Sequence, residues 1–236
     1  MLPPENRIAM ISGANRGIGL AIAEELGRRG YRLSLGVRSP EKLPQSLTAL
    51  GDQAKAFRYD AADRSTQEAW VASTSKHFGQ IDILVNNAGI SSRVGLMDDN
   101  EGGLDTLWQV NCKAPLNMIR LVMPYLEATG HGRIINVASL SGKRVKNDNV
   151  GYAMTKFAVM ALTHAARQHG WDKGVRATAV CPSFVATDMT TSVTKVSRSE
   201  MIDARDLAEL VATAIALPNT ASVAELLVNC RLEDTL

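Results

Sequence analysis

The sequence predicts a single α/β domain built on a doubly wound parallel sheet of about seven strands flanked by helices. Short β-rich runs alternate along the chain with helical patterns of roughly ten to twenty residues. Strands separated by helices pair in parallel through right-handed crossovers. The 236 residues are 45% hydrophobic, which suffices for one sizeable core, and no linker, repeat or low-complexity segment divides them.

The expected strands are short apolar runs bounded by turn-forming residues. The first is the run RIAMIS, which Gly13 ends, and the fourth is the run IDILVN. In chain order, strands are expected at residues 7–12, 32–37, 55–59, 81–86, 133–138, 175–181 and 225–229.

Between the strands, apolar residues recur every three to four positions, as on one face of a helix. This spacing predicts helices at residues 17–29, 41–50, 65–78, 103–127, 152–168 and 204–217. Ser39 and Pro40 signal the start of the second helix, and Gly79 ends the third. Because Pro115 and Pro124 lie inside the fourth, we expect local irregularity in that helix.

Composition excludes several classes of protein. A net charge of +2 argues against a nucleic-acid-binding protein, which needs a concentrated basic face. Cys112, Cys181 and Cys230 are far apart and form no C-x-x-C pair, and the histidines lack ligand spacing, so no disulfide or metal site is expected. The sequence shows no signal peptide and no membrane span. We therefore expect a cytoplasmic protein.

A glycine-rich segment, SGANRGIG, follows the first strand, with glycines at positions 13, 17 and 19. Glycine permits tight turns and close approach of a phosphate, and the N-terminus of the following helix offers free N–H groups. The pattern is not G-x-G-x-x-G, because Ile22 stands where the third glycine would be. The alternative is a strand-to-helix turn without a ligand.

The end of the second strand indicates which dinucleotide would bind. An acidic residue there holds the ribose 2′-hydroxyl of NAD, but the segment LGVRS has none. Arg38 instead can face a 2′-phosphate, and Arg16 can reach the same place. NADP is therefore favoured over NAD. The alternative is that both arginines are solvated surface charges.

Tyr152 and Lys156 lie one helical turn apart and share a face of the predicted helix. A phenol is a weak acid at neutral pH, and a nearby ammonium group stabilises its phenolate form. The pair thus suits general acid–base catalysis. Ser139 lies at the end of the fifth strand, where its hydroxyl could hydrogen-bond a substrate oxygen; Ser141 is its close neighbour. Asn111 interrupts the long helix and could hold a water.

With these motifs in order, the chain resembles ordinary-length members of the short-chain dehydrogenase/reductase family, from residue 8 to about residue 189. The motifs that carry the resemblance are Gly13-x-x-x-Gly17-x-Gly19, Asp60, Asn86-Asn87-Ala88-Gly89, Asn111, Ser139, Tyr152-x-x-x-Lys156, and Pro182 with Thr187. The family has a Rossmann fold and transfers hydride without a metal.

The resemblance implies a role for each of these residues. Tyr152 would exchange the proton with the substrate oxygen, Ser139 would orient that oxygen, and Lys156 would bind the nicotinamide ribose. Asn111 would hold a water in a proton relay through Lys156, and Asp60 would contact the adenine. The residues expected to bind the cofactor are Gly13, Asn15, Arg16, Gly17, Ile18, Gly19, Arg38, Asp60, Asn87, Ala88, Gly89, Tyr152, Lys156, Pro182, Val185 and Thr187.

Three positions depart from the family pattern. Ser183 replaces the glycine that usually follows Pro182, and Thr155 replaces a serine before Lys156. The segment LLVNCRLEDTL lacks the usual aspartate-glycine-glycine ending. The polar, Ser/Thr-rich segment around residues 183–203 is expected to form a substrate lid.

The expected activity is hydride transfer between NADP(H) and a small carbonyl or alcohol substrate, in a homodimer or homotetramer. A 3-oxoacyl thioester reductase and a sugar or small-ketone reductase both fit the sequence. One alternative is a non-catalytic dinucleotide-binding sensor or scaffold, and another is an epimerase or dehydratase on the same scaffold, although these usually run longer.

Overall fold

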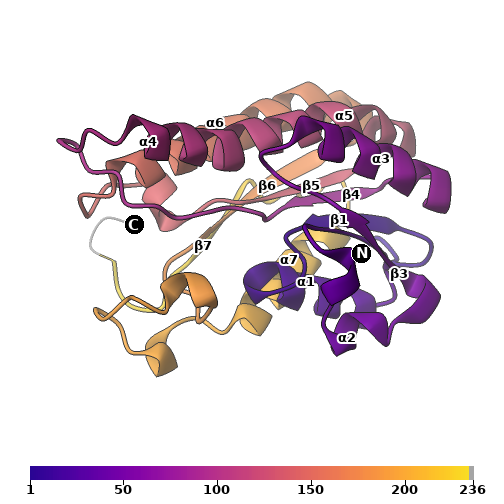
Figure 1. The fold of residues 1–236 in the computed structure, drawn as a ribbon. Coiled ribbons are helices and arrows are strands. Elements are labelled where there is room, and N and C mark those ends of the chain that lie inside the picture. Colours follow the sequence, from indigo (N-terminus) through magenta and orange to yellow (C-terminus); the bar gives the residue numbers. More distant parts are fainter. Residues whose placement is uncertain (234–236) are drawn as a thin grey trace.

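A computed structural model describes residues 1–233, and its seven-stranded sheet carries helices on both faces (Figure 1). The strands are β1 (Ile8–Ser12), β2 (Arg32–Val37), β3 (Ala54–Arg58), β4 (Ile83–Asn86), β5 (Arg133–Val137), β6 (Arg176–Pro182) and β7 (Glu225–Val228). Each neighbouring pair is parallel, in the order β3-β2-β1-β4-β5-β6-β7. The predicted doubly wound parallel sheet is confirmed.

The order of the strands reverses between β1 and β4, because the chain builds outward from β1 to β3 and then returns to start the other half. Ligands of such sheets bind beyond the carboxyl ends of the strands, at the point of reversal. All seven strands run in the same direction, so the residues that follow them meet at one edge of the sheet. We call this the carboxyl edge.

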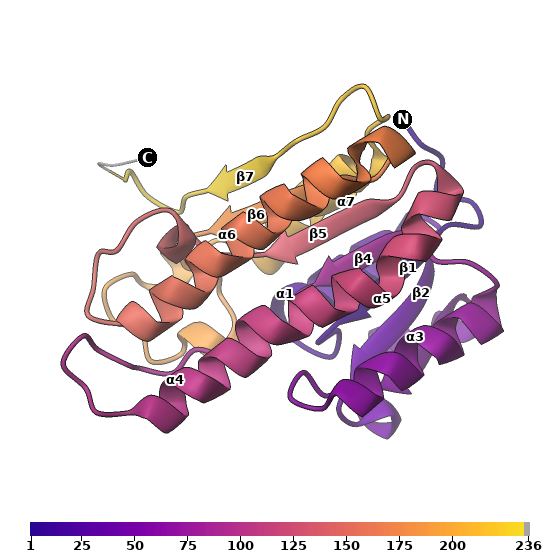
Figure 2. The ribbon, with the colours of Figure 1, turned by 90° about the horizontal axis from the view of Figure 1, so that it is seen from above.

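Helices cover both faces of the sheet, as the two views show (Figures 1 and 2). One face carries α1 (Gly17–Arg28), α2 (Gln45–Thr48) and α7 (Ala204–Ala216), and the other carries α3 (Arg64–Phe78), α4 (Glu101–Trp108), α5 (Ala114–Thr129) and α6 (Val150–Gly170). No helix among residues 1–233 is both long and apolar enough to cross a membrane.

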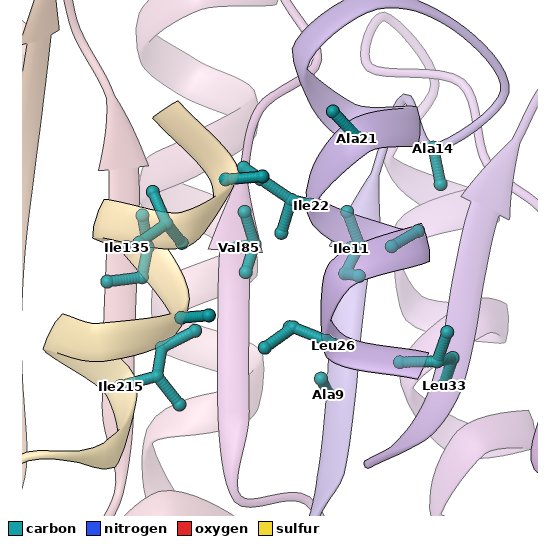
Figure 3. Packing of buried hydrophobic residues seen from close by; sticks show 14 of the residues in the cluster. Ala9, Ile11, Ala14, Ala21, Ile22, Leu26, Leu33, Val85, Ile135 and Ile215 are labelled. Atoms are coloured by element: carbon teal, nitrogen blue, oxygen red, sulfur yellow. The ribbon is translucent and has the colours of Figure 1, made fainter. Parts of the chain in front are cut away.

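The core between α1, α7 and the sheet fixes the position of the α1 N-terminus. Ile22 and Leu26 of α1 are fully buried against Ile11 and Val85 of the central strands and Ile215 of α7 (Figure 3). The strands β1 and β4 are buried along their whole length, as expected for a sheet covered on both faces. The glycine-rich segment between β1 and α1 is therefore held at both ends by apolar packing.

The prediction of one helix at residues 41–50 was wrong. The structure has instead a tight turn at Pro40–Lys42, the short helix α2, and a second tight turn at Gly51–Gln53. Pro44 explains the break, because it has no N–H to donate and biases the residue before it away from helical geometry. It adopts an extended ψ of 147° immediately before α2.

The irregularity expected in the long helix is present, but it does not lie at the prolines. A wide π-helical turn at Gln109–Lys113 separates α4 from α5, and the Ala114 N–H donates to the Gln109 carbonyl five residues earlier. Pro115 follows this turn directly as the second residue of α5, and Pro124 lies inside α5. Asn111 is therefore at the centre of the distortion.

Candidate active site

The glycine-rich segment after β1 is tightly folded at the carboxyl edge. Gly13 and Gly17 have φ angles of 67° and 56°, in the left-handed region that favours glycine. Gly19 has no such angle, but a Cβ built on it would collide with the Gly13 carbonyl oxygen and the side-chain amide of Asn87. Backbone conformation therefore favours glycine at positions 13 and 17, and close packing requires it at position 19.

Two side chains hold this segment in place, and only one of them was predicted. The Ser12 hydroxyl accepts hydrogen bonds from the backbone N–H groups of Asn87 and Ala88, each at 3.0 Å. The Asn87 side-chain amide donates to the carbonyls of Ser12 at 2.9 Å and Gly13 at 3.2 Å. Asn87 thus braces the glycine-rich segment from beyond β4. Ser12 was missed, although a hydroxyl at the end of a buried strand could have signalled it.

The N-terminus of α1 suits the pyrophosphate of a dinucleotide. The side chain of Arg16, which precedes the helix, makes no capping hydrogen bond, and the first turn has no acidic residue. A helix start of this kind presents N–H donors and a partial positive charge to an anion. The structure therefore fits a phosphate group at the place where the sequence predicted one.

The two arginines proposed for a 2′-phosphate lie in different surroundings. Arg38 follows β2 directly and is exposed. Arg16 forms an exposed ion pair with Asp188, with 3.3 Å between its Nη1 and the carboxylate oxygen. Arg16 therefore joins the start of α1 to the segment that follows β6. Asp60 follows β3, and its carboxylate accepts from the Ala62 N–H at 2.9 Å.

Tyr152 and Lys156 lie together on α6, as their spacing predicted. The Lys156 ammonium group is 5.5 Å from the centre of the Tyr152 ring and donates to the Val137 carbonyl at 2.9 Å. Lys156 is only 7% exposed. Its charge is thus fixed between the end of β5 and the tyrosine ring, and Tyr152 itself is partly exposed.

A turn after β5 brings Ser139 against the same helix. The Ser139 hydroxyl accepts from the Ser141 N–H at 3.1 Å and caps the turn Leu140–Gly142. A Cβ on Gly142 would lie 2.6 Å from the Lys156 carbonyl oxygen. The missing side chain at Gly142 therefore lets the Ser139 turn press against α6.

Asn111 connects the segment after β4 to α6. Its side-chain carbonyl accepts from the Ile90 N–H at 2.9 Å, and its amide donates to the Ile90 carbonyl at 3.0 Å and the Thr155 hydroxyl at 3.2 Å. Thr155 in turn donates to the Tyr152 carbonyl at 2.8 Å. The side chain of Asn111 therefore links the segment after β4 to α6. Thr155, which stands where the family usually has serine, keeps the hydroxyl that accepts the hydrogen bond from Asn111.

The segment after β6 is shaped by its own hydrogen bonds. Val185 is buried and forms a bridge with Ile202, and its carbonyl accepts from the Thr187 N–H at 2.8 Å. The Arg198 guanidinium donates to the Thr187 carbonyl at 3.3 Å. At Ser183, the departure from the family pattern, the hydroxyl accepts from the Cys230 N–H at 2.9 Å. Ser183 thus ties the start of this segment to the chain beyond β7.

Two cysteines near these elements, Cys112 and Cys181, are buried. Burial raises the pKa of the Cys112 and Cys181 thiols to about 11, so both are protonated at neutral pH. Among residues 1–233, no group of three or more His, Cys, Asp or Glu side chains lies close enough together to hold a metal ion.

Replacing Gly19 with alanine should weaken dinucleotide binding and lower the free energy of unfolding by about 1–3 kcal/mol, because the new methyl group collides with Gly13 and Asn87. Calorimetric titration and thermal unfolding measure the two effects. Gly102→Ala is the matched control, since a Cβ there meets no atom within 4 Å. Equal behaviour of the two variants would contradict the packing described for the glycine-rich segment.

Comparisons with known proteins agree with this geometry. A family model described as short chain dehydrogenase matches residues 7–197. An agropine synthesis reductase of Rhizobium rhizogenes is 44% identical over 97% of this chain, and this chain spans 54% of that relative, about half its length. An uncharacterised oxidoreductase of Staphylococcus epidermidis is 32% identical, with 95% of this chain and 97% of the relative covered.

Two solved structures are similar along nearly the whole chain. The first is an alcohol dehydrogenase from the archaeon Thermococcus sibiricus complexed with 5-hydroxy-NADP. It has a TM-score of 0.87 and 28% identity, and covers 96% of this chain and 99% of its own. The second is a metagenomic short-chain oxidoreductase in complex with NADP, with a TM-score of 0.82, 30% identity, and coverage of 98% of this chain and 100% of its own.

Proposed function

Because the chain belongs to the short-chain dehydrogenase family, we propose that it transfers a hydride between NADP(H) and a small carbonyl or alcohol substrate, with Tyr152 exchanging the proton. The observation that carries the proposal is the Lys156 ammonium group, which is buried, held by Val137, and 5.5 Å from the centre of the Tyr152 ring. The names of an agropine synthesis reductase and an alcohol dehydrogenase support the two directions of the reaction.

The dinucleotide would be held at the reversal of strand order between β1 and β4. Its pyrophosphate would accept hydrogen bonds from the start of α1, along the segment of Gly13, Asn15, Gly17, Ile18 and Gly19. The other proposed contacts come from the residues after the remaining strands, namely Arg38, Asp60, Asn87, Ala88, Gly89, Pro182, Val185 and Thr187. The bound nicotinamide supplies or accepts the hydride.

The protein's own part in the reaction is to manage the substrate oxygen. Tyr152 donates its phenolic proton to that oxygen during reduction and takes it back during oxidation. Ser139, which caps the turn that packs against the Lys156 backbone, donates a second hydrogen bond and orients the substrate. Lys156 stabilises the phenolate that remains, and Asn111 holds the neighbouring chain segment at Ile90 and would hold a relay water.

Further features support finer parts of the proposal. The segment 183–203 would act as a lid, joined to the start of α1 by the Arg16–Asp188 ion pair. Trp108 on α4 and Met154 and Phe157 on α6 expose large apolar side chains, which supports a homodimer or homotetramer. The three cysteines are free, which supports a cytoplasmic location.

The direct test is a screen of ketones, aldehydes and alcohols with NADPH or NADP⁺, followed at the nicotinamide absorbance. Turnover of at least one carbonyl class, at a rate that depends on Tyr152, supports the proposal. Tight dinucleotide binding without turnover across the whole panel would instead support a non-catalytic sensor.

The cofactor preference has its own prediction. NADPH should bind more tightly than NADH, and Arg38→Met should weaken NADPH binding alone, because a charge-assisted hydrogen bond to the 2′-phosphate contributes about 1.5–3 kcal/mol. That loss corresponds to roughly ten- to a hundredfold in Kd. Fluorescence titration with both cofactors measures it, with NADH as the internal control. Equal affinities in the unchanged protein would remove the role given to Arg38.

A further inference from the structure

A compact cluster of charges lies outside the catalytic set. The Glu233 carboxylate accepts from Arg144 through Nε at 3.1 Å and Nη2 at 2.8 Å, and from the Lys146 ammonium group at 2.8 Å. All three bonds reach the same carboxylate oxygen. The Glu233 side chain is 7% exposed and that of Arg144 is 18% exposed. Two cations thus surround one largely buried carboxylate.

The charges of this cluster do not balance. Arg144 and Lys146 supply two positive charges against the single negative charge of Glu233. Lys143, the neighbouring cation, is paired separately with Glu225 at 2.7 Å. The hydrogen bond from Lys146 holds the pKa of the Glu233 carboxyl below its usual range, so the group stays ionised near neutral pH. Guanidinium and ammonium donors that converge on one carboxylate form a receptor for carboxylates in general.

The cations lie in the loop that joins two of the proposed catalytic residues. The Arg144 N–H donates to the Leu140 carbonyl at 3.2 Å, in the turn that Ser139 caps. The loop ends where α6 begins, two residues before Tyr152. Along the chain, Arg144 and Lys146 therefore lie between the group that would orient the substrate and the group that would protonate it, and the backbone of Arg144 is held by the Ser139 turn.

Glu233 is distant from this loop in sequence but lies at the same edge of the sheet. In both views, β7 ends at this edge and the loop between β5 and α6 lies there (Figures 1 and 2). After β7 the chain is tied by the Cys230 N–H to Ser183, where the segment following β6 begins. Glu233 therefore reaches the loop from the side of the proposed nicotinamide-binding segment.

Charged contacts, rather than apolar packing, hold the chain around Glu233. The adjacent Leu232 is 91% exposed. Arg231 is also exposed, and its guanidinium donates to the Lys195 carbonyl at 3.5 Å. A carboxylate from another molecule offers Arg144 and Lys146 the same chemistry as Glu233. Because the side chain of Leu232 is exposed, such a ligand can displace Glu233 without loss of apolar burial at that residue.

We propose that Arg144 and Lys146 bind the carboxylate of an oxo acid substrate, and that Glu233 occupies this site until the substrate arrives. The inference rests on the proposed reductase function and adds a substrate class to it. The substrate carbonyl lies toward Ser139 and Tyr152, and its carboxylate lies toward the loop. Glu233 is then an internal competitor that lowers the affinity for the acid.

The test uses matched pairs of ligands, each an oxo acid such as 4-oxopentanoate with its methyl ester, in chain lengths from about three to eight carbons. Calorimetry with the full chain, alone and with NADP⁺, measures binding without turnover. The acid should bind at least about tenfold more tightly than its ester in one or more pairs, because only the acid can accept charge-assisted hydrogen bonds at both oxygens. Equal affinity for acid and ester throughout the panel overturns the proposal.

Variants distinguish binding of the acid at Arg144 and Lys146 from nonspecific attraction to nearby positive charge. Glu233→Gln should tighten binding of the acid and Lys146→Met should weaken it, each by about tenfold and without effect on the ester. Lys146 is 40% exposed, so its replacement preserves the fold more safely than that of Arg144. Arg231→Met, which removes a cation of the same segment outside the cluster, should change neither affinity. Unchanged acid binding in Glu233→Gln overturns the role of Glu233 as competitor.

The outcomes also separate this inference from the proposed function. Preferential binding of the acid without its reduction by NADPH contradicts the reductase function and retains the carboxylate site. Reduction of acids and esters with equal kcat/KM and equal affinity retains the reductase function and overturns the carboxylate site.

Discussion

Replacing Tyr152 with phenylalanine is expected to lower kcat by about 10²- to 10⁴-fold, the usual contribution of a general acid–base group. The ring would remain 5.5 Å from the Lys156 ammonium group, so the packing of α6 is kept and only the exchangeable proton is lost. Cofactor affinity should therefore change little. Steady-state kinetics and fluorescence titration of the same preparation measure the two quantities.

Tyr125→Phe is the matched control for this prediction. It makes the same chemical change on α5, where Tyr125 lines a cavity of about 260 Å³ together with Asp82, at the opposite edge of the sheet. That variant should keep the full kcat. A Tyr152→Phe protein with near-normal turnover would refute the assignment of the acid.

Lys156→Met should cause the second largest fall in kcat. A unit charge 5.5 Å from the ring centre stabilises a phenolate by about 3 kcal/mol at an effective dielectric constant near 20. Loss of that stabilisation corresponds to a fall of roughly 10²-fold in kcat. The variant also loses the hydrogen bond to Val137, so cofactor binding should weaken as well.

Lys113→Met is the matched control, because it removes an exposed lysine at the end of the π-helical turn. It should leave both kcat and cofactor affinity unchanged. A Lys156→Met protein with near-normal kcat would contradict the role given to Lys156.

The sequence predicted the architecture well because hydrophobic periodicity reports burial directly. The seven strands and the parallel order follow from runs such as Ile8–Ser12, which is buried throughout. The same signal failed between β2 and β3, where Pro44 interrupts an apolar spacing that otherwise looks helical. Periodicity records which residues are buried, and the backbone conformation at a proline is decided locally.

For the candidate site, the sequence predicted contacts within one helix better than contacts between distant segments. Tyr152 and Lys156 are one turn apart, so their proximity is a property of any helix. The hydroxyl of Ser12, by contrast, binds the backbone 75 residues away, and Arg144 binds Glu233 at a separation of 89 residues. No local pattern encodes such pairs, because they arise only when strand order brings distant segments to one edge.

Two sets of contacts, one on each side of it, constrain the number of residues in the π-helical turn at Gln109–Lys113. Each residue of a helix advances about 100° around its axis. Deleting one residue from the turn would either carry the Asn111 amide away from Ile90 or rotate the buried row of Met118 and Val122 off the sheet. The extra residue therefore sets the rotation at which Asn111 reaches Ile90 while Met118 and Val122 stay buried against the sheet.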